Sequence, residues 1–575
     1  IMPSLVGSEM CIRDRCRPFD SRAPRRVFRA LFLSMADLSS LLGTPGKQVP
    51  SAAPASHEVD PGNDTWRSHL RIGEAYNQHL PSTWDASYVP PTASASVPRV
   101  SLAVSTDLKQ WNYRYMFEKK GERSMELDTR LSVMGDEIRH AFGLTAEWDD
   151  PSIPNQESIY TVGRICARVD PGTRNEEQKE HVRLTPANLM LETSRMVGNG
   201  QRISLVIDPQ CTVRYAWASQ AESVSSVTGL FPGMILGVKG RNGSGQRFVA
   251  EELLIPPPLP HPATLQSELM TNQYGESRLA GTPLRVMMAG GPFTPTSDLE
   301  YGPWHAFMTH VELARPDVLL LLGPFVSVQH PIIATGNLDT LPTDLFKHHI
   351  SRRITRLIER SPSTVVILVP STDDMIHTHY AYPQPFLDKS DPTLGLPKRV
   401  RCLPNPSVFY VNELAIGVST ADTLGDLRRE ELVQRVQSGS QGTPQSKGVN
   451  DPIVRLVRHV LGQRHFYPLF PPSPVSRVPL DLSHSRLCAF DTSTPDLILL
   501  PSTSTKPCIR IVDSSVVVNP GSLVSSDESG THPSAYVQMQ VDPMPRERLQ
   551  ATIDDADPLL THELYRRARI DLVYT

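Results

Sequence analysis

The pattern of apolar and polar positions predicts a layered α/β domain in the second half of the chain. From about residue 284 to residue 575, short uninterrupted apolar runs alternate with stretches in which apolar residues recur every three or four positions. Uninterrupted runs bounded by turns are typical of strands that are buried on both faces. The five clearest runs are 285–288, 317–322, 365–369, 497–500 and 515–518. Strands that alternate with helices in this way form layered α/β domains.

Three amphipathic helices are expected between these strands. Their apolar faces are formed by Trp304, Phe307, Val311 and Ala314, by Phe346, Ile350, Ile354 and Leu357, and by Ile453, Leu456, Val457 and Val460. The third helix follows Asn450-Asp451-Pro452, which supplies an N-cap side chain and a proline in the first turn. Residues 437–449 are rich in Gly, Ser and Gln, and we expect them to form a disordered surface loop.

A different pattern precedes this domain, because residues 158–260 contain five short strand-like stretches separated by turn-forming sequences such as Asn242-Gly243. Five short strands in about 100 residues predict a small closed barrel, and an OB-fold is the leading candidate. The sequence PPPLPHP at 256–262 marks its end. Before the barrel, the helical segment 106–157 carries an apolar face of Leu127, Leu131, Met134, Ile138 and Phe142.

The first 105 residues show neither pattern. Residues 35–105 are rich in Ser, Pro and Ala, so they cannot bury enough apolar surface to offset chain entropy, and we expect a flexible linker. Residues 1–34 contain seven arginines. They fit either a transit peptide or an artefactual segment upstream of a start at Met35, and we expect the latter.

Composition and charge exclude several classes of protein. The net charge of −4 is too balanced for a chain held to DNA or membrane mainly by bulk electrostatics. No apolar run reaches the roughly 20 residues that a membrane-spanning helix needs. The seven cysteines include no CxxC pair, which argues against a zinc module or a disulfide scaffold and for reduced thiols inside the cell.

Several sequence blocks occur in the order seen in a known family. ARPDVLLLLGPF, VVILVPSTDD, VFYVNELAIGVST, RHFYPLFPP, PDLILLPS and VVVNPGSL follow one another, and YRYMFEK precedes the barrel. This order resembles the B subunits of eukaryotic DNA polymerase alpha, which are the second subunits of the polymerase alpha–primase complex. The resemblance covers roughly residues 114–541, and the small N-terminal helical domain of such subunits is not recognisable here.

The resemblance implies an α/β plus β architecture, in which an OB-fold barrel packs on a calcineurin-like phosphoesterase domain that has lost its metal centre. It also implies a non-catalytic scaffold subunit in the nucleus, active during the initiation of DNA replication. Its expected partners are the C-terminal, zinc-bearing region of the catalytic polymerase subunit and, through the complex, primase. No cofactor is expected in this chain, and the residues that contact the partners stay unknown.

The residues themselves can be tested against the loss of a metal centre. An active two-metal phosphoesterase carries Asp, His and Asn ligands at the ends of its strands, in the order D-x-H, G-D, G-N-H and G-H-x-H. The corresponding positions here are Gly290 and Gly291, Gly323 and Pro324, Pro370 and Ser371, and Asn519 and Pro520. All four loops depart from the required pattern. We therefore predict that metal-dependent hydrolysis has been lost and that the chain has no catalytic residues.

Other interpretations remain open at this point. His377-Thr378-His379, with Asp373 and Asp374 nearby, imitates a metal motif, but it follows the third strand instead of the last, so we expect no metal there. The barrel has few aromatics, which makes DNA contact at most auxiliary. The alternatives are a B subunit of polymerase delta or epsilon, an active metal-dependent phosphoesterase or nuclease, and a free single-strand-binding protein.

Overall fold

The computed structural model describes residues 70–84, 88–89, 97–105, 107–168, 182–216, 227–435, 451–476, 478–525, 532–550 and 557–575. The doubtful segment 1–34, the expected linker as far as residue 69 and the expected loop 437–449 lie outside the described residues. Within the described ranges, every helix is too short or too polar to cross a membrane.

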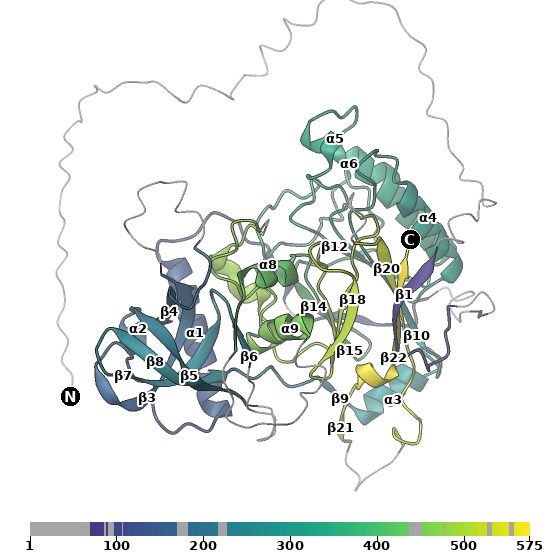
Figure 1. Cartoon of the computed structure of the whole chain (residues 1–575). Helices are drawn as coiled ribbons and strands as arrows, with labels where there is room; N and C mark the ends of the chain where they lie inside the picture. The colour runs from purple at the N-terminus through teal and green to yellow at the C-terminus, as the bar shows by residue number, and fades with distance from the viewer. Residues whose placement is uncertain are drawn as a thin grey trace, which may run out of the picture. The chain divides into compact units, whose positions relative to one another are not determined.

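Two sheets form the centre of the α/β part (Figure 1). In spatial order, the first contains β1 (Arg71–Tyr76), β22 (Ala568–Tyr574), β20 (Ala535–Val541), β10 (Leu284–Gly290), β11 (Val318–Leu322), β12 (Val365–Val369) and β13 (Arg401–Cys402). The second contains β18 (Cys508–Val512), β19 (Ser515–Asn519), β17 (Leu497–Leu499), β15 (Leu414–Val418), β14 (Ser407–Val411) and β2 (Leu102–Val104). The five apolar runs of the sequence coincide with β10, β11, β12, β17 and β19, as predicted.

Every residue of β10 is buried, and its alternate side chains serve two different cores. Val286 and Met288 belong to the apolar layer between the two sheets. Met287 and Ala289 point to the opposite face, where they join the cluster that contains Trp304 of α4 (Gly302–Ala314). The first sheet is thus covered on both faces, which is why its strands appear in the sequence as continuous apolar runs.

Helices complete the layers. The outer face of the first sheet packs against α4, the π-helix η6 (Phe346–Ser351) and α7 (Arg352–Arg360). On the other side, α8 (Thr423–Glu430) and α9 (Pro452–Gly462) share an apolar cluster with residues of the second sheet. The three predicted helices are confirmed, and the Asp451 side chain caps α9 by accepting a hydrogen bond from the Ile453 backbone N–H. The π-helical start of the second helix was not expected from its periodicity.

The predicted barrel is present and closed. Its strands are β3 (Asn155–Ala167), β4 (Leu189–Thr193), β5 (Arg202–Tyr215), β8 (Arg247–Ile255) and β7 (Ile235–Asn242), in that spatial order. The β5–β8 pair is parallel and the other four pairs are antiparallel. The predicted helix is α1 (Glu122–Ala141), which packs Leu131, Met134 and Ile138 against the outside of the barrel.

Short elements connect these parts. They are η4 (Leu108–Trp111), α2 (Arg195–Gly198), β6 (Val227–Leu230), β9 (Ala263–Leu265), α3 (Gln266–Tyr274), α5 (Pro331–Ala334), α6 (Pro342–Leu345), β16 (Leu432–Arg435), η7 (Leu482–Cys488), β21 (Leu559–Thr561) and α10 (Leu564–Arg567).

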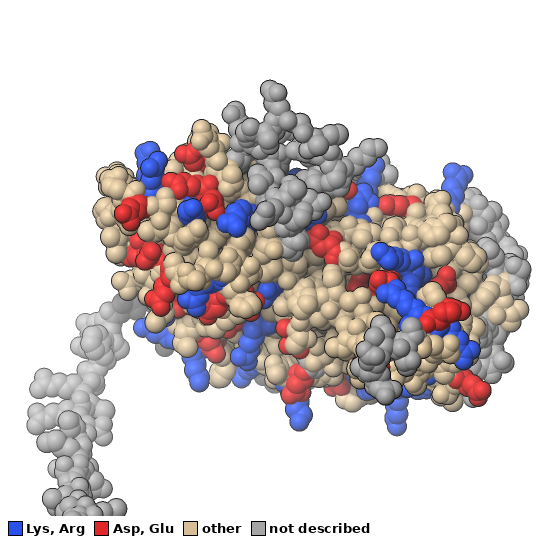
Figure 2. All heavy atoms as spheres, turned by 90° about the horizontal axis from the view of Figure 1, so that it is seen from below, with Lys and Arg blue, Asp and Glu red and all other residues tan. Residues whose placement is uncertain are grey.

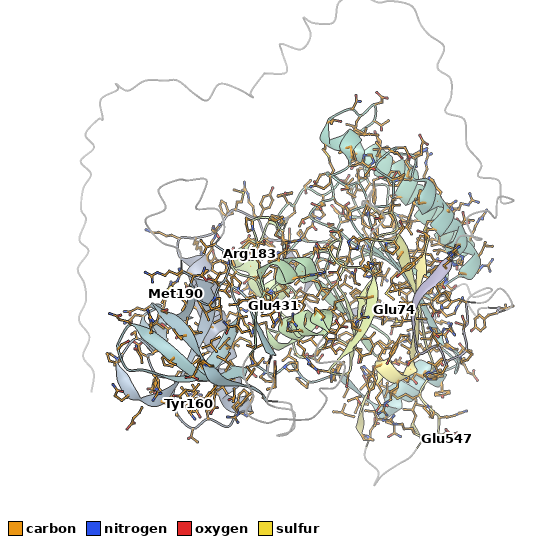
Figure 3. All side chains as sticks on the ribbon, in the orientation of Figure 1. Glu74, Tyr160, Arg183, Met190, Glu431 and Glu547 are labelled. Carbon is orange, nitrogen blue, oxygen red and sulfur yellow. The ribbon has the colours of Figure 1, made fainter. Side chains whose placement is uncertain are left out.

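The barrel region and the α/β part are joined through β6, which pairs with β16. Beside this pair, the buried carboxylate of Glu431, which is labelled in Figure 3, accepts hydrogen bonds from Arg455 and His459. Burial opposes its charge, but the hydrogen bonds from His459 and Arg455 outweigh that effect and lower the pKa of Glu431 to about 2. The junction therefore contains a carboxylate that stays ionised at neutral pH.

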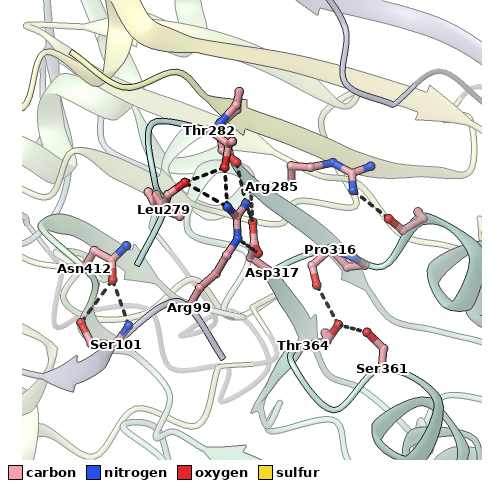
Figure 4. Close-up of polar contacts among 12 residues, drawn as sticks. Arg99, Ser101, Leu279, Thr282, Arg285, Pro316, Asp317, Ser361, Thr364 and Asn412 are labelled. Carbon is pink, nitrogen blue, oxygen red and sulfur yellow. Dashed lines mark hydrogen bonds and ion pairs between the residues drawn. The ribbon is translucent and has the colours of Figure 1, made fainter. Parts of the chain in front are cut away.

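The expectation of a flexible linker over residues 35–105 was wrong for two parts of that range. β1 pairs with β22, so the purple strand β1 and the yellow strand β22 lie side by side in Figure 1, and β2 pairs with β14. Arg99 is also fixed, because its guanidinium donates to both carboxylate oxygens of Asp317 at 2.7 and 2.8 Å (Figure 4). These contacts join residues hundreds of positions apart, and local composition does not reveal such pairing.

Candidate functional site

The loops that the sequence singled out meet at one edge of the α/β part. β10, β11 and β12 are parallel neighbours, so their carboxyl ends lie at the same edge of the sheet. We call the loops at this edge the strand-end cluster, which consists of residues 290–292, 323–325, 370–374 and 519–521. Backbone hydrogen bonds of 2.8 Å run from Gly291 N to Leu322 O and from Gly323 N to Val369 O, and a Cβ on Gly290 would lie 2.9 Å from Gly521 O.

The loops of the strand-end cluster approach one another closely. A Cβ atom added to Gly291 would lie 2.0 Å from the carbonyl oxygen of Pro324. A Cβ on Gly323 would lie 2.2 Å from Oδ2 of Asp374. Both separations are far below a van der Waals contact, so neither position accommodates a side chain of any kind. Neighbouring loops therefore occupy the space in which a side chain at either position would begin.

Asp374 fills the middle of the cluster, a role that sequence reasoning did not assign to it. Its carboxylate accepts hydrogen bonds from the backbone N–H groups of Phe325, of Val326 at 3.1 Å and of Ser371 at 2.9 Å. The residue is 4% exposed. Burial raises its pKa to about 7, against the opposing effect of these three backbone donors. Asp374 therefore binds two loops of the cluster together and is itself almost fully shielded from solvent.

Asn519 is also committed to internal hydrogen bonds. Its Oδ1 accepts from the backbone N–H groups of Ser502 and Gly521, each at 3.0 Å. Its Nδ2 donates to the carbonyl oxygens of Thr505 at 3.0 Å and Lys506 at 3.2 Å. Both the oxygen and the nitrogen of the amide are hydrogen-bonded, so this side chain stabilises the loop that precedes β18.

The two histidines of the imitation metal motif, His377 and His379, are held by contacts within the protein. His377 Nε2 lies 3.0 Å from the carbonyl oxygen of Pro385, and His377 Nδ1 accepts from the backbone N–H of His379. The His379 ring lies edge-on to Tyr113 and Tyr115, with centroid distances of 4.8 and 4.7 Å. Burial, followed by the neighbouring His377, lowers the pKa of His379 to about 4. Among the residues that the structure describes, no three His, Cys, Asp or Glu side chains gather in a way that could hold a metal ion.

One hydrogen-bonded chain resembles a hydrolase triad and was not foreseen from the sequence. Thr264 Oγ1 lies 2.8 Å from His562 Nε2, and His562 Nδ1 lies 2.7 Å from Asp496 Oδ2. His562 is 1% exposed, and the same Asp496 oxygen accepts from the backbone N–H of Ala415. A buried base cannot reach a substrate, so these bonds fasten β9 to the second sheet. Thr264 and His562 are 298 positions apart in the sequence, so sequence reasoning could not predict the arrangement.

The surface carries both charges. On the face shown in Figure 2, basic and acidic side chains are interspersed, and neither sign covers a large area. The barrel follows the same pattern, because Arg202 and Arg164 share Glu192, while Arg214 and Lys239 share Glu252. Paired charges of this kind leave little net field for a nucleic acid strand to follow.

Comparison with known proteins agrees with these features. Residues 286–508 match the family of B subunits of DNA polymerases alpha and epsilon, and residues 124–255 match the OB domain of the DNA polymerase alpha B subunit. The B subunit of DNA polymerase alpha from Schizosaccharomyces pombe is 30% identical over 504 residues, which cover 86% of this chain and 79% of that protein. The chain belongs to the family of DNA polymerase alpha B subunits.

Two further relatives support the same assignment. The B subunit of DNA polymerase alpha from Saccharomyces cerevisiae is 30% identical over 84% of this chain and 68% of its own length. The rat protein of the same name is 25% identical over 75% of this chain and 62% of its own length. The predicted family and the predicted OB barrel are thus confirmed, and the alternative of a delta or epsilon subunit is set aside. The comparisons assign no role to individual residues of the strand-end cluster.

Proposed function

We propose that this chain is a non-catalytic accessory and scaffold subunit of the nuclear DNA polymerase alpha–primase complex, acting in the initiation of DNA replication. In this proposal it binds the C-terminal, zinc-bearing region of the catalytic polymerase subunit, and primase is held through the same assembly. Membership of the family of DNA polymerase alpha B subunits supports the catalytic polymerase subunit as the partner. The strand-end cluster supports the non-catalytic role, and it is the observation that carries the proposal.

We further propose that the α/β part is a calcineurin-like phosphoesterase fold that has lost its metal centre. Two facing sheets with helices on the outside, and loops gathered at the carboxyl ends of parallel strands, support this fold. Metal-dependent hydrolysis needs carboxylate and imidazole groups that are free to bind cations and water. The polar groups of the strand-end cluster are instead consumed by backbone hydrogen bonds, as Asp374 and Asn519 illustrate.

Affinity capture of the full chain from its own cells tests the scaffold role. We expect recovery of a large polymerase subunit and two primase subunits in amounts that match this chain. Recovery of the chain by itself, under conditions in which the polymerase subunit stays intact, contradicts the proposal.

Hydrolysis of bis(p-nitrophenyl) phosphate by the purified chain, with Mn²⁺ or Mg²⁺ added, tests the loss of the metal centre. We expect no hydrolysis above the rate of the metal ion alone. Activity that disappears in Asp374→Asn and persists in Asp388→Asn, a carboxylate outside the cluster, would overturn this part of the proposal. Binding of the polymerase subunit is measured on the same preparation, so the two parts fail separately.

A further inference from the structure

A row of basic side chains lies on the solvent side of the helix formed by η6 and α7. His348, Arg352, Arg356 and Arg360 recur every fourth residue and therefore share one face, while Ile354 and Leu357 are fully buried on the opposite face. At about 1.5 Å per residue, the row is about 18 Å long. Arg352 lies 2.8 Å from His348 Nδ1, so neighbouring members are in contact.

A single buried carboxylate forms ion pairs with three arginines of this helix. Glu312 of α4 has a side chain that is 5% exposed, and its oxygens lie 2.7 Å from Arg360, 3.4 Å from Arg353 and 3.6 Å from Arg356. The side chains of Arg356 and Arg360 are 49% and 55% exposed, so part of each guanidinium remains available to solvent. Glu312 thus orients these side chains and neutralises one of the three charges.

Further cations continue the row beyond the end of α7. The Arg399 guanidinium donates to the carbonyl oxygen of Pro362, just after the helix, and Lys398 beside it is exposed. Residues 352–360 and 398–399 contain six Arg and Lys residues, against one Glu of their own and Glu312 beneath them. We call the exposed members of this set the cationic face: Arg352, Arg356, Arg360, Lys398 and Arg399.

The excess of positive charge contributes to lower pKa values of two neighbouring groups, Arg353 and His349. Burial is the main cause that lowers the pKa of Arg353, and the nearby Arg356 and Arg360 lower it further against the attraction of Glu312. The pKa of His349 falls to about 4 through burial, with additional effects of His305, His348 and Arg352. Bringing a line of negative charge to this face would relieve the repulsion.

We propose that the cationic face binds the phosphate backbone of a nucleic acid strand without reading its sequence. The guanidinium group of arginine forms bidentate hydrogen bonds with phosphate oxygens, and every member of the cationic face except Lys398 is an arginine. Residues 346–360 expose no large apolar side chain of the kind on which a protein partner would pack. Contacts to phosphate groups require cationic side chains spaced along the path of the strand, and this face supplies such a row.

Fluorescence anisotropy of the purified full chain tests the proposal, with one labelled single strand and one labelled duplex, each about 30 nucleotides long, as probes. The test variant is Arg352→Glu/Lys398→Glu/Arg399→Glu, which leaves the arginines that contact Glu312 in place. The matched control is Lys119→Glu/Lys120→Glu/Arg247→Glu, at exposed positions before and within the barrel. Both variants carry the same change in net charge, and circular dichroism verifies that each is folded.

We expect the wild-type chain to bind at least one probe at low salt, and the test variant to bind that probe more than about tenfold more weakly. The slope of log affinity against log salt should fall by about 3, or about one for each phosphate contact removed. The control should bind like wild type. The proposal is overturned if wild type binds neither probe at about 50 mM salt, if the two variants behave alike, or if poly-glutamate at equal charge displaces the probe completely.

Discussion

The strand-end cluster and the cationic face use polar residues in opposite ways. In the cluster, the Asp374 carboxylate and the Asn519 amide are buried, and backbone groups of the same molecule satisfy them. Beneath the cationic face, one buried carboxylate is shared by three arginines, and the two that belong to the face keep about half of their side chains in water. A polar group that is buried and saturated contributes to stability, whereas an exposed excess of charge is available to a partner. Changes in the first region should therefore alter unfolding, and changes in the second should alter binding.

The largest effect is expected for Gly291→Ala. The new methyl group would lie 2.0 Å from a backbone carbonyl, and a backbone atom cannot rotate away as a side chain can. We expect a loss of about 3 kcal/mol or more in unfolding free energy, measured by denaturant titration. Gly302→Ala is the control, because a Cβ there meets no atom within 4 Å. Equal midpoints for the two variants would show that the loops are not in contact.

Asp374→Asn should have a smaller effect that depends on pH. At low pH both oxygens of the protonated carboxyl can still accept hydrogen bonds, whereas the amide nitrogen of Asn cannot, so one backbone N–H loses its acceptor and we expect a loss of about 1–3 kcal/mol. The pKa of Asp374 is raised to about 7 in the folded state, so the folded state retains a proton that the unfolded chain releases near its ordinary pKa. Wild-type stability relative to Asp374→Asn should therefore decrease as pH rises from about 4 to about 7 and then stay level. Thermal unfolding across that range would refute this account if the difference between the two proteins stayed constant.

Glu312→Gln tests a residue that shares a property with each region. Its carboxylate is buried, like the polar groups of the strand-end cluster, and it lies beneath the cationic face. Its removal leaves Arg353, Arg356 and Arg360 without the counter-charge between them, and we expect a loss of about 1–3 kcal/mol. The loss should be larger at low salt, because salt screens the repulsion between the exposed arginines. Unfolding at about 50 mM and about 500 mM salt measures this difference. Glu300→Gln, an exposed carboxylate near the start of α4, should show no such change.

The smallest effect on stability is expected for the triple substitution of Arg352, Lys398 and Arg399 by Glu. These side chains are exposed and lie outside the buried ion pairs, so the change in unfolding free energy should stay below about 0.5 kcal/mol. The same variant is the one expected to lose nucleic acid affinity. A large drop in its unfolding midpoint would show that this face is a structural element instead of a binding surface.

Much of the fold could be predicted from local sequence. The apolar runs located β10, β11, β12, β17 and β19, because strands covered on both faces admit few polar residues. Turn residues and short strands predicted the barrel, and the N-cap at Asp451 predicted the start of α9. β1 escaped prediction because its sequence, RIGEAY, carries little apolar signal and its partner strand ends one residue before the end of the chain.

The candidate site, like the fold, could be predicted only in part from the sequence. The sequence predicted that four loops depart from a metal-binding pattern and that they lie at strand ends, and the structure confirms their position. The sequence held no sign that Asp374 would accept hydrogen bonds from Phe325 and Val326, or that Glu312 would lie beneath three arginines of another helix. Periodicity and spacing are local properties of a chain, and they determined the elements and the residue types. Contacts across dozens or hundreds of residues depend on how the layers pack, and only the tertiary structure decided which polar groups are buried together and which are left to solvent.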